Sequence, residues 1–276
     1  MARLLADKLS ARTKQKVIVE NKPGAGTTIG ARAVAKAAPD GNTLLFASTS
    51  HVVSAALYTK LDYDPLKDFA AVARVAEGGW ILVMSPTVPV KSVKELVAYS
   101  KMHPNALSIG YGAGTAPHLV VELFKQATGA RLLNVPYKGA SQTLPDLITG
   151  RLHLNVTGTA GIRQLIDGGK LRVIASTGAT RDPNLPDVPT MAESGYPEMT
   201  LSFWLGVLAP ARTPAAAIVK LNQDINNGLD HPETKALMDK LGFKLIRESP
   251  AEFAMLISTE AATWKKVADK AGLKVN

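Results

Sequence analysis

Cysteine is absent from the 276-residue chain. This absence excludes disulfides, thiol nucleophiles and thiolate metal sites, although it does not identify the compartment. Long apolar runs are missing too, since no stretch approaches the roughly eighteen residues of a membrane-spanning helix. Runs of like charge are also absent, and the few aromatic residues, 5% of the chain, do not interleave with basic ones. Nucleic-acid binding is therefore not expected.

What the chain does contain is enough apolar material for a core. Hydrophobic residues make up 46% of it and charged residues only 20%, which is typical of a globular protein of one large domain or two ordinary ones. Lysine and arginine outnumber the acids 32 to 23, a formal charge of +9. A positive field favours anionic partners, but a solvated basic surface explains the same numbers equally well.

Short apolar runs alternate with helical patterns almost to the end of the chain. Repeated strand–helix–strand units predict an α/β fold with mostly parallel sheets that are covered on both faces. Helix signals support this reading: Ser92 and Ser249 each begin a capping box, Pro214 occupies a first helical position, and Gly150 follows a helix. The expected strands are 16–20, 43–47, 80–84, 107–110, 132–135, 152–156, 171–176, 203–208 and 243–247.

A glycine loop follows the first apolar run, in the stretch "VIVENKPGAGTTIG" (17–30). Glycines let a ligand approach the main chain, and the amides of the next helix favour an anion. A nucleotide-binding P-loop is excluded because Ala31 and Arg32 follow Gly30. A dinucleotide site lacks its ribose-binding acid, since the next strand runs into hydroxyls at 48–50. A loop that serves only as a tight turn remains an equal alternative.

A second segment of the same design, "LSIGYGAGTAPHL" (107–119), strengthens the ligand-binding reading. Loops rich in glycine at the carboxyl ends of two strands, one in each half of the chain, predict a cleft between two α/β lobes. Two further loops, 137–139 and 156–161, belong to the same half. We expect one lobe at 1–103 plus 209–276 and the other at 104–208, with hinges near 81–92 and 204–215.

Several motifs together resemble one known family. They are "VIVENKPGAGTTIGARAVAKAAPDGNTLLFAST", "YDPLKDFAAVARVA", "GYGAGTAPHLVVELFKQATGARLLNVPYKGA", "GGKLRVIAST" and "WLGVLAPARTP". The chain is similar over its whole length to the extracytoplasmic solute receptors of tripartite tricarboxylate transporters, the Bug or TctC-like receptors. The resemblance implies a type II periplasmic-binding-protein fold, the two-lobed Venus flytrap.

The resemblance also implies a function. The expected ligand is a small organic carboxylate, the expected partners are the membrane permease subunits, and the expected location is the periplasm. No cofactor is expected, and a monomeric state is expected if the chain is complete. In that family, amides and hydroxyls at strand–helix loops hold the carboxylate. Carried over to this sequence, the binding residues are Gly26, Thr27, Ser48, Thr49, Ser50, Gly112, Ala113, Gly114, Thr115, His118, Tyr137, Lys138, Gly139 and Thr157.

The chain departs from the family pattern in two places. The family begins with a strand and a proline–glycine loop, and here neither precedes the helix that starts at Met1. We therefore expect that the first strand is missing, that no signal peptide is present and that the chain is truncated at its N-terminus. Thr157 stands where the family often carries an acid that contacts a ligand amino group, which disfavours an amino-acid ligand.

Catalysis is not expected from these loops. The five histidines show no metal spacing. His51 follows a serine, but no acid and no nucleophile elbow accompany the pair. His118 is more typical of a packing or capping role than of a ligand contact. Two other classes stay open: a nucleotide-dependent α/β enzyme, and the ligand-sensing domain of a regulator, for which the stretch before residue 17 is too short to hold a DNA-binding motif.

Overall fold

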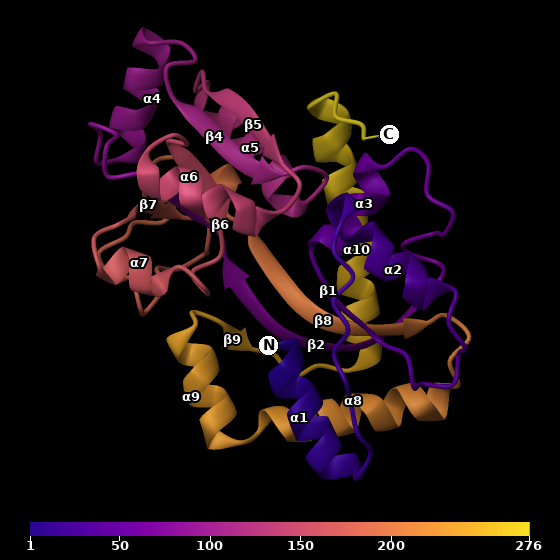
Figure 1. Cartoon of the computed structure of the whole chain (residues 1–276). Coiled ribbons are helices and arrows are strands. Elements are labelled where there is room, and N and C mark those ends of the chain that lie inside the picture. Colours follow the sequence, from indigo (N-terminus) through magenta and orange to yellow (C-terminus); the bar gives the residue numbers. More distant parts are fainter. Residues whose placement is uncertain (276) are drawn as a thin grey trace. The chain divides into compact units, whose positions relative to one another are not determined.

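The chain divides into two compact units, which Figure 1 shows in one view. The computed structural model describes residues 1–275, with the side chains of Ala140 and Ser141 outside that description. Unit 1 comprises 1–77, 204–239 and 243–276, and unit 2 comprises 78–203 and 240–242. The sequence division differs, because it places 78–103 in the first lobe and 204–208 in the second. Residues 81–84 pair with strands of unit 2, which is why the division falls before them.

Unit 1 is built on a four-stranded sheet in the order β1-β8-β2-β9. Its strands are β1 (Leu45–Ser48), β2 (Phe69–Gly79), β8 (Ser202–Pro210) and β9 (Lys244–Leu245). β1 pairs with β8 and β9 pairs with β2, both antiparallel. β1 therefore lies at one edge of this sheet, next to the long strand β8.

Helices cover both sides of the unit 1 sheet (Figure 1). On one side, α1 and α8 place Leu5, Leu9 and Ile225 against buried residues of β2. On the other side, α10 packs beside α3 and brings Phe253 against β8. The helices of this unit are α1 (Ala2–Thr13), α2 (Thr28–Ala35), α3 (Ser50–Leu57), α8 (Ala215–Leu229), α9 (Pro232–Lys240) and α10 (Pro250–Lys270), with a 3₁₀ turn η1 (Ala25–Thr27).

In unit 1 one strand prediction was wrong and one strand was missed. Residues 16–20 form no strand: Val17 packs on the core, but Ile18 is 75% exposed, and within residues 1–275 the segment has no strand partner. The longest strand, β2, was not predicted, because its sequence "FAAVARVAEGG" is rich in alanine and glycine, which are depleted in strands. Pairing with neighbours on both sides overrides that weak propensity.

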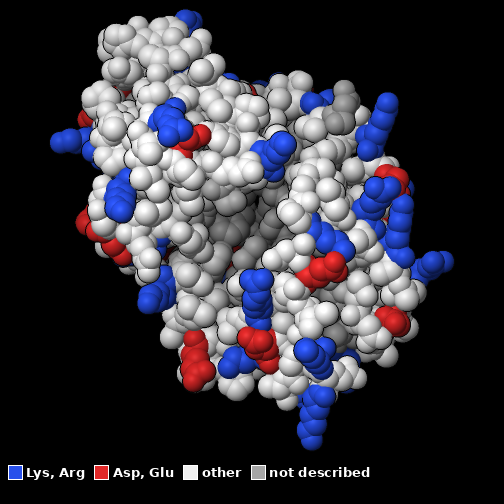
Figure 2. Space-filling model, viewed as in Figure 1, with Lys and Arg blue, Asp and Glu red and all other residues white. Residues whose placement is uncertain are grey.

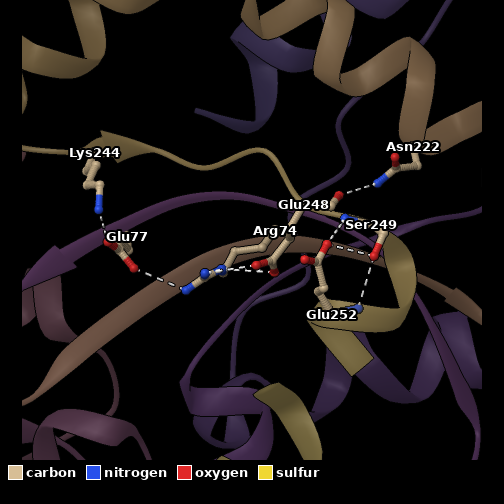
Figure 3. Close-up of polar contacts among 7 residues, drawn as sticks. All are labelled: Arg74, Glu77, Asn222, Lys244, Glu248, Ser249 and Glu252. Atoms are coloured by element: carbon tan, nitrogen blue, oxygen red, sulfur yellow. Dashed lines mark hydrogen bonds and ion pairs between the residues drawn. The ribbon is translucent and has the colours of Figure 1, made fainter. Parts of the chain in front are cut away.

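A charged network joins β2 to the C-terminal segment within unit 1 (Figure 3). The guanidinium of Arg74 binds both carboxylate oxygens of Glu248, at 3.0 and 2.9 Å, and reaches Glu77 at 3.1 Å. Lys244 binds the other oxygen of Glu77 at 3.1 Å. Arg74 and Glu248 are mostly shielded from solvent, so this two-pronged pair is screened less than a surface ion pair.

Unit 2 is built on a five-stranded sheet in the order β5-β4-β6-β3-β7. β4 (Ser108–Gly112) is parallel to both β5 (Leu133–Tyr137) and β6 (Leu154–Thr157). β3 (Ile81–Met84) is antiparallel to β6 and to β7 (Arg172–Ser176). The α/β class is confirmed, but the sheets are mixed and not mostly parallel. The reason is that β3 follows β2 directly and inserts between two strands that a helix connects.

Four helices belong to unit 2, and its core lies between them and the sheet. Buried Leu147 and Ile162 pack with Ile81 and Val83 of β3, while Leu119 and Phe124 of α5 are also fully buried. The helices are α4 (Val93–Met102), α5 (Ala116–Thr128), α6 (Leu144–Thr149) and α7 (Arg163–Asp167), with 3₁₀ turns η2 (Ala140–Thr143) and η3 (Pro197–Met199). Among the described residues, no helix is long and apolar enough to cross a bilayer.

The helix signals read from the sequence hold with small changes. Ser249 and Glu252 form the predicted capping box at the start of α10. Ser92 accepts from the amide of Glu95, but Glu95 accepts from Lys91 instead of completing the box. Pro214 is the N-cap of α8 and not its first residue. Gly150 ends α6 in the left-handed conformation, as expected.

Candidate functional site

The predicted binding residues of unit 2 meet at one edge of its sheet. Gly112, the last residue of β4, is in register with Tyr137, the last residue of β5, and the Ala113 amide donates to the Tyr137 carbonyl at 2.9 Å. Asn155 pairs with Gly110, so Thr157 ends β6 at the same level. The carboxyl ends of three parallel strands thus bring the 112–115 loop, the 137–139 loop and Thr157 together, as the sequence predicts.

Thr115 stabilises its own loop at the start of α5 through hydrogen bonds. It is the N-cap of the helix, yet its hydroxyl donates to the Gly112 carbonyl at 2.7 Å, and its amide donates to the same oxygen at 3.3 Å. Gly114 has a φ of +72°, a conformation that glycine adopts without strain. The hydroxyl of Thr115 would therefore have to leave Gly112 before it could donate to a ligand.

Asn155 is a polar residue of this region that sequence reasoning missed. It is buried, and its side-chain amide donates to the Gly110 carbonyl at 3.0 Å. The signal was present, because Asn155 lies two residues before Thr157 and alternate residues of a strand share a face. Its hydrogen bond fixes β6 against β4 immediately below the loop cluster.

The third loop presents three different environments. Tyr137 is half-buried and its hydroxyl donates to Asp146 at 2.9 Å; burial, and then the Asp146 carboxylate, raise the pKa of Tyr137. Lys138 is exposed, and a methyl group on Gly139 would meet no atom within 4 Å. Tyr137 is thus hydrogen-bonded within unit 2, whereas Lys138 is exposed and the space beside Gly139 is unfilled.

His118 is buried in the first turn of α5. Its ring stacks on Tyr111, with centroids 4.2 Å apart and planes 7° apart. Its Nδ1 atom has no hydrogen-bond partner in the described part of the chain. Burial lowers the pKa of His118, so the ring is neutral at neutral pH. This geometry is that of a packed residue beneath the loop cluster.

In unit 1, Thr27 and Ser48 line one cavity of about 260 Å³ beside the edge strand β1. Gly26 and Thr27 have φ angles of +59° and +84°, so the turn before α2 is left-handed at both positions. Gly26 is buried and Thr27 is exposed. The rest of the lining is mostly apolar and was not predicted; it consists of Ala31, Leu45, Phe46, Ala47, His51 and Leu205.

The hydroxyl loop after β1 holds its three side chains differently. Ser48 is half-buried and faces the cavity, and the Ser50 amide donates weakly to its oxygen at 3.4 Å. Ser50 is buried in the first turn of α3. Thr49 is 1% exposed, and its hydroxyl oxygen accepts from the Trp204 amide at 2.9 Å. Of the three, Thr49 is therefore engaged with β8.

His51 follows this loop and is bound to the chain rather than to a serine. Its Nε2 atom lies 2.7 Å from the Pro65 carbonyl, and its ring meets Phe69 edge-on at 4.7 Å. Burial lowers the pKa of His51 to about 4, although the bond to Pro65 opposes that change. The ring is neutral at neutral pH, so Nε2 carries the proton and donates to the carbonyl.

Charge does not gather on the face of the molecule that Figure 2 shows. Figure 2 shows basic side chains dispersed over the visible face with acidic ones among them, and no continuous basic patch of described residues. Over residues 1–275, no three histidine or acidic side chains group where they could hold a metal ion. What the loops offer a ligand is therefore hydroxyls, main-chain amides and apolar walls.

Comparisons with known proteins agree on one family. Residues 1–273 match the family model described as tripartite tricarboxylate transporter family receptor. The structure of the periplasmic binding protein BugD is 32% identical, with a TM-score of 0.92 over 99% of this chain and 92% of that one. Rpa4515 of R. palustris, solved with adipate, is 34% identical, with a TM-score of 0.93 over 99% and 92%. MatC from Rhodopseudomonas palustris, with bound malate, is 30% identical, with a TM-score of 0.90 over 96% and 92%.

Proposed function

We propose, because the chain belongs to the tripartite tricarboxylate transporter family of receptors, that it binds a small organic carboxylate and delivers it to the membrane permease subunits of such a transporter. Family and structural neighbours are solute-binding receptors, and two of those neighbours hold dicarboxylates, adipate and malate. The same membership supports a periplasmic location and a monomeric receptor.

The observation that carries the proposal is the convergence of three loops at the carboxyl edge of the unit 2 sheet. Strand ends of this kind direct main-chain amides and short hydroxyl side chains toward a ligand. The residues available there are Gly112, Gly139 and Thr157, with Lys138 exposed beside them. A carboxylate accepts hydrogen bonds and carries negative charge, so amide and hydroxyl donors and a lysine suit it.

Unit 1 supplies a second group of donors around the cavity beside β1. Ser48 and Thr27 line it together with apolar side chains, which suits a ligand with a short hydrocarbon portion next to a polar end. The net charge of +9 favours an anionic ligand over a neutral one.

We expect binding without turnover. In the described loops neither histidine serves a hydroxyl as a base, since His51 donates to Pro65 and His118 stacks on Tyr111. A hydroxyl without a base is a poor nucleophile. Recovery of a chemically altered ligand after long incubation, absent with heat-treated protein, would contradict this.

A thermal-shift screen over mono-, di- and aromatic carboxylates, with adipate and malate included, tests the proposal. A ligand present at about 100 times its dissociation constant stabilises the folded protein by about 2.7 kcal/mol. Failure of every carboxylate to raise the melting temperature, at concentrations up to about 1,000 times a micromolar dissociation constant, would refute the proposed ligand class.

Calorimetry with the best carboxylate then tests the site. Ser48→Ala and Thr157→Val each remove one hydroxyl, and a lost hydrogen bond to a charged ligand weakens binding by about 1.5–3 kcal/mol. Thr263→Val is the matched control, because its hydroxyl bonds only within α10 and is exposed. Equal affinity in all three variants would show that neither Ser48 of unit 1 nor Thr157 of unit 2 contacts the carboxylate.

A further inference from the structure

The loop that follows β1 is tied to β8 by a paired contact between two residues. The Trp204 amide donates to the Thr49 hydroxyl oxygen at 2.9 Å, and the Thr49 amide donates to the Trp204 carbonyl at 3.2 Å. The antiparallel ladder of β1 and β8 ends at Ser48 and Leu205. Thr49 therefore extends the pairing by one step through its side chain, and Ser48 and Ser50 stand on either side of that anchor.

Trp204 is in turn held by α10. Its indole nitrogen donates to Glu260 Oε2 at 2.8 Å, and its ring meets Phe253 edge-on with centroids 5.0 Å apart. Trp204 is 1% exposed, so its ring is not free to turn in this packing. Glu260 also accepts a hydrogen bond from Trp264 and faces the positive charge of Arg74. The carboxylate thus fixes the indole from a helix that contributes no residue to the loop.

We infer that Glu260, acting through Trp204 and Thr49, is a positioning residue that holds Ser48 where a ligand can reach it. The inference rests on the proposed function, because it assumes that the carboxylate ligand binds at the loop after β1. It assigns to Thr49 the role of an anchor, with its oxygen committed to the Trp204 amide, and not that of a direct ligand contact.

The contacts from Glu260 through Trp204 to Thr49 predict that variants which keep each acceptor will behave like the parent protein. Variants that remove an acceptor should not. Glu260→Gln keeps an oxygen that accepts from the indole, and Thr49→Ser keeps the hydroxyl. Glu260→Leu and Thr49→Val remove the acceptor in each case. Glu252→Leu is the control for a weakened α10, because Glu252 belongs to the capping box of that helix and its bonds are to Ser249.

Two measurements are made on each full-length variant, well below its melting temperature. Hydrogen–deuterium exchange without ligand reports protection of the 45–57 segment, and calorimetry reports adipate and malate affinity. We expect faster exchange in that segment, and affinity weaker by about fivefold to tenfold, for Glu260→Leu and Thr49→Val, the loss typical of one hydrogen bond. Glu260→Gln and Thr49→Ser should stay within about twofold of the parent protein.

Three results would overturn the inference. One is unchanged exchange in the 45–57 segment of both disruptive variants. Another is faster exchange there with unchanged affinity. The third is an equal effect of Glu252→Leu, which would mean that the loop responds to general loss of stability. If the parent protein binds neither dicarboxylate, the affinities are measured with the best carboxylate of the thermal-shift screen. If no carboxylate binds, it is the proposed function that fails, and the exchange comparison alone then decides whether Glu260 controls the loop.

Discussion

Acidification should destabilise unit 1 through His51. Burial lowers the pKa of this ring from 6.5 to about 4 in the folded protein, whereas in the unfolded chain it titrates near 6.5. Between these values the unfolded chain takes up a proton and the folded protein does not, so stability falls as the pH falls. The contribution is fully present above pH 6.5 and is lost as the pH approaches 4.

The size of the effect follows from the two pKa values. The difference between 6.5 and about 4 corresponds to about 3 kcal/mol at its limit, of which about 2 kcal/mol should already be lost at pH 5. Burial also lowers the pKa values of His118 and His153, which adds to the loss in the same direction. A variant of His51 is therefore needed to separate its share.

His51→Gln is that variant, because glutamine can still donate to the Pro65 carbonyl but does not titrate. We expect the unfolding free energy from urea titrations to fall less between pH 7.5 and pH 5 in the variant than in the parent, by about 2 kcal/mol. Equal slopes in the two proteins, or a direct NMR titration of the His51 ring near its ordinary pKa, would refute the reasoning.

Two further predictions concern packing and motion. A methyl group on Gly206 would lie 2.4 Å from Phe253 Cζ, so Gly206→Ala should lower the unfolding free energy by about 1–3 kcal/mol, and Phe253→Leu in the same chain should recover part of it; a stable single variant in urea melts would contradict this. If the lobes close on a ligand at the hinges predicted near 81–92 and 204–215, the radius of gyration should fall in small-angle scattering, and an unchanged radius at saturating carboxylate would count against hinge bending.

Part of the loop cluster of unit 2 could be predicted from the sequence. Strands, helices and glycine turns alternate regularly from 107 to 157, and a regular alternation has one favoured topology, the right-handed parallel crossover. The sequence placed Gly112, Tyr137 and Thr157 in loops of the same half of the chain, and the register brings these loops to one edge of the unit 2 sheet. Their contact with a ligand stays a prediction.

Side-chain direction at the same loops could not be predicted. Thr115 and Thr49 both looked like hydroxyls available to an anion, but one donates to Gly112 and the other accepts from Trp204. A hydroxyl can turn toward any nearby polar group, and nothing in the local sequence indicates which one is closest. The local sequence also does not show which strand a segment will pair with, which is why alanine-rich β2 was overlooked.

By itself the sequence determined the local features of this protein: the capping box at Ser249, the left-handed stop at Gly150, and the glycine turns that precede α2 and α5. These depend on groups within a few residues of one another, so their energies are the same in any context that lets the segment form. The tertiary structure alone decided that β3 inserts antiparallel between β6 and β7, and that Thr49 anchors to a tryptophan 155 residues away. Such choices depend on which distant surfaces meet, because burying a polar group forces it to find its partner among whatever the packed fold brings near.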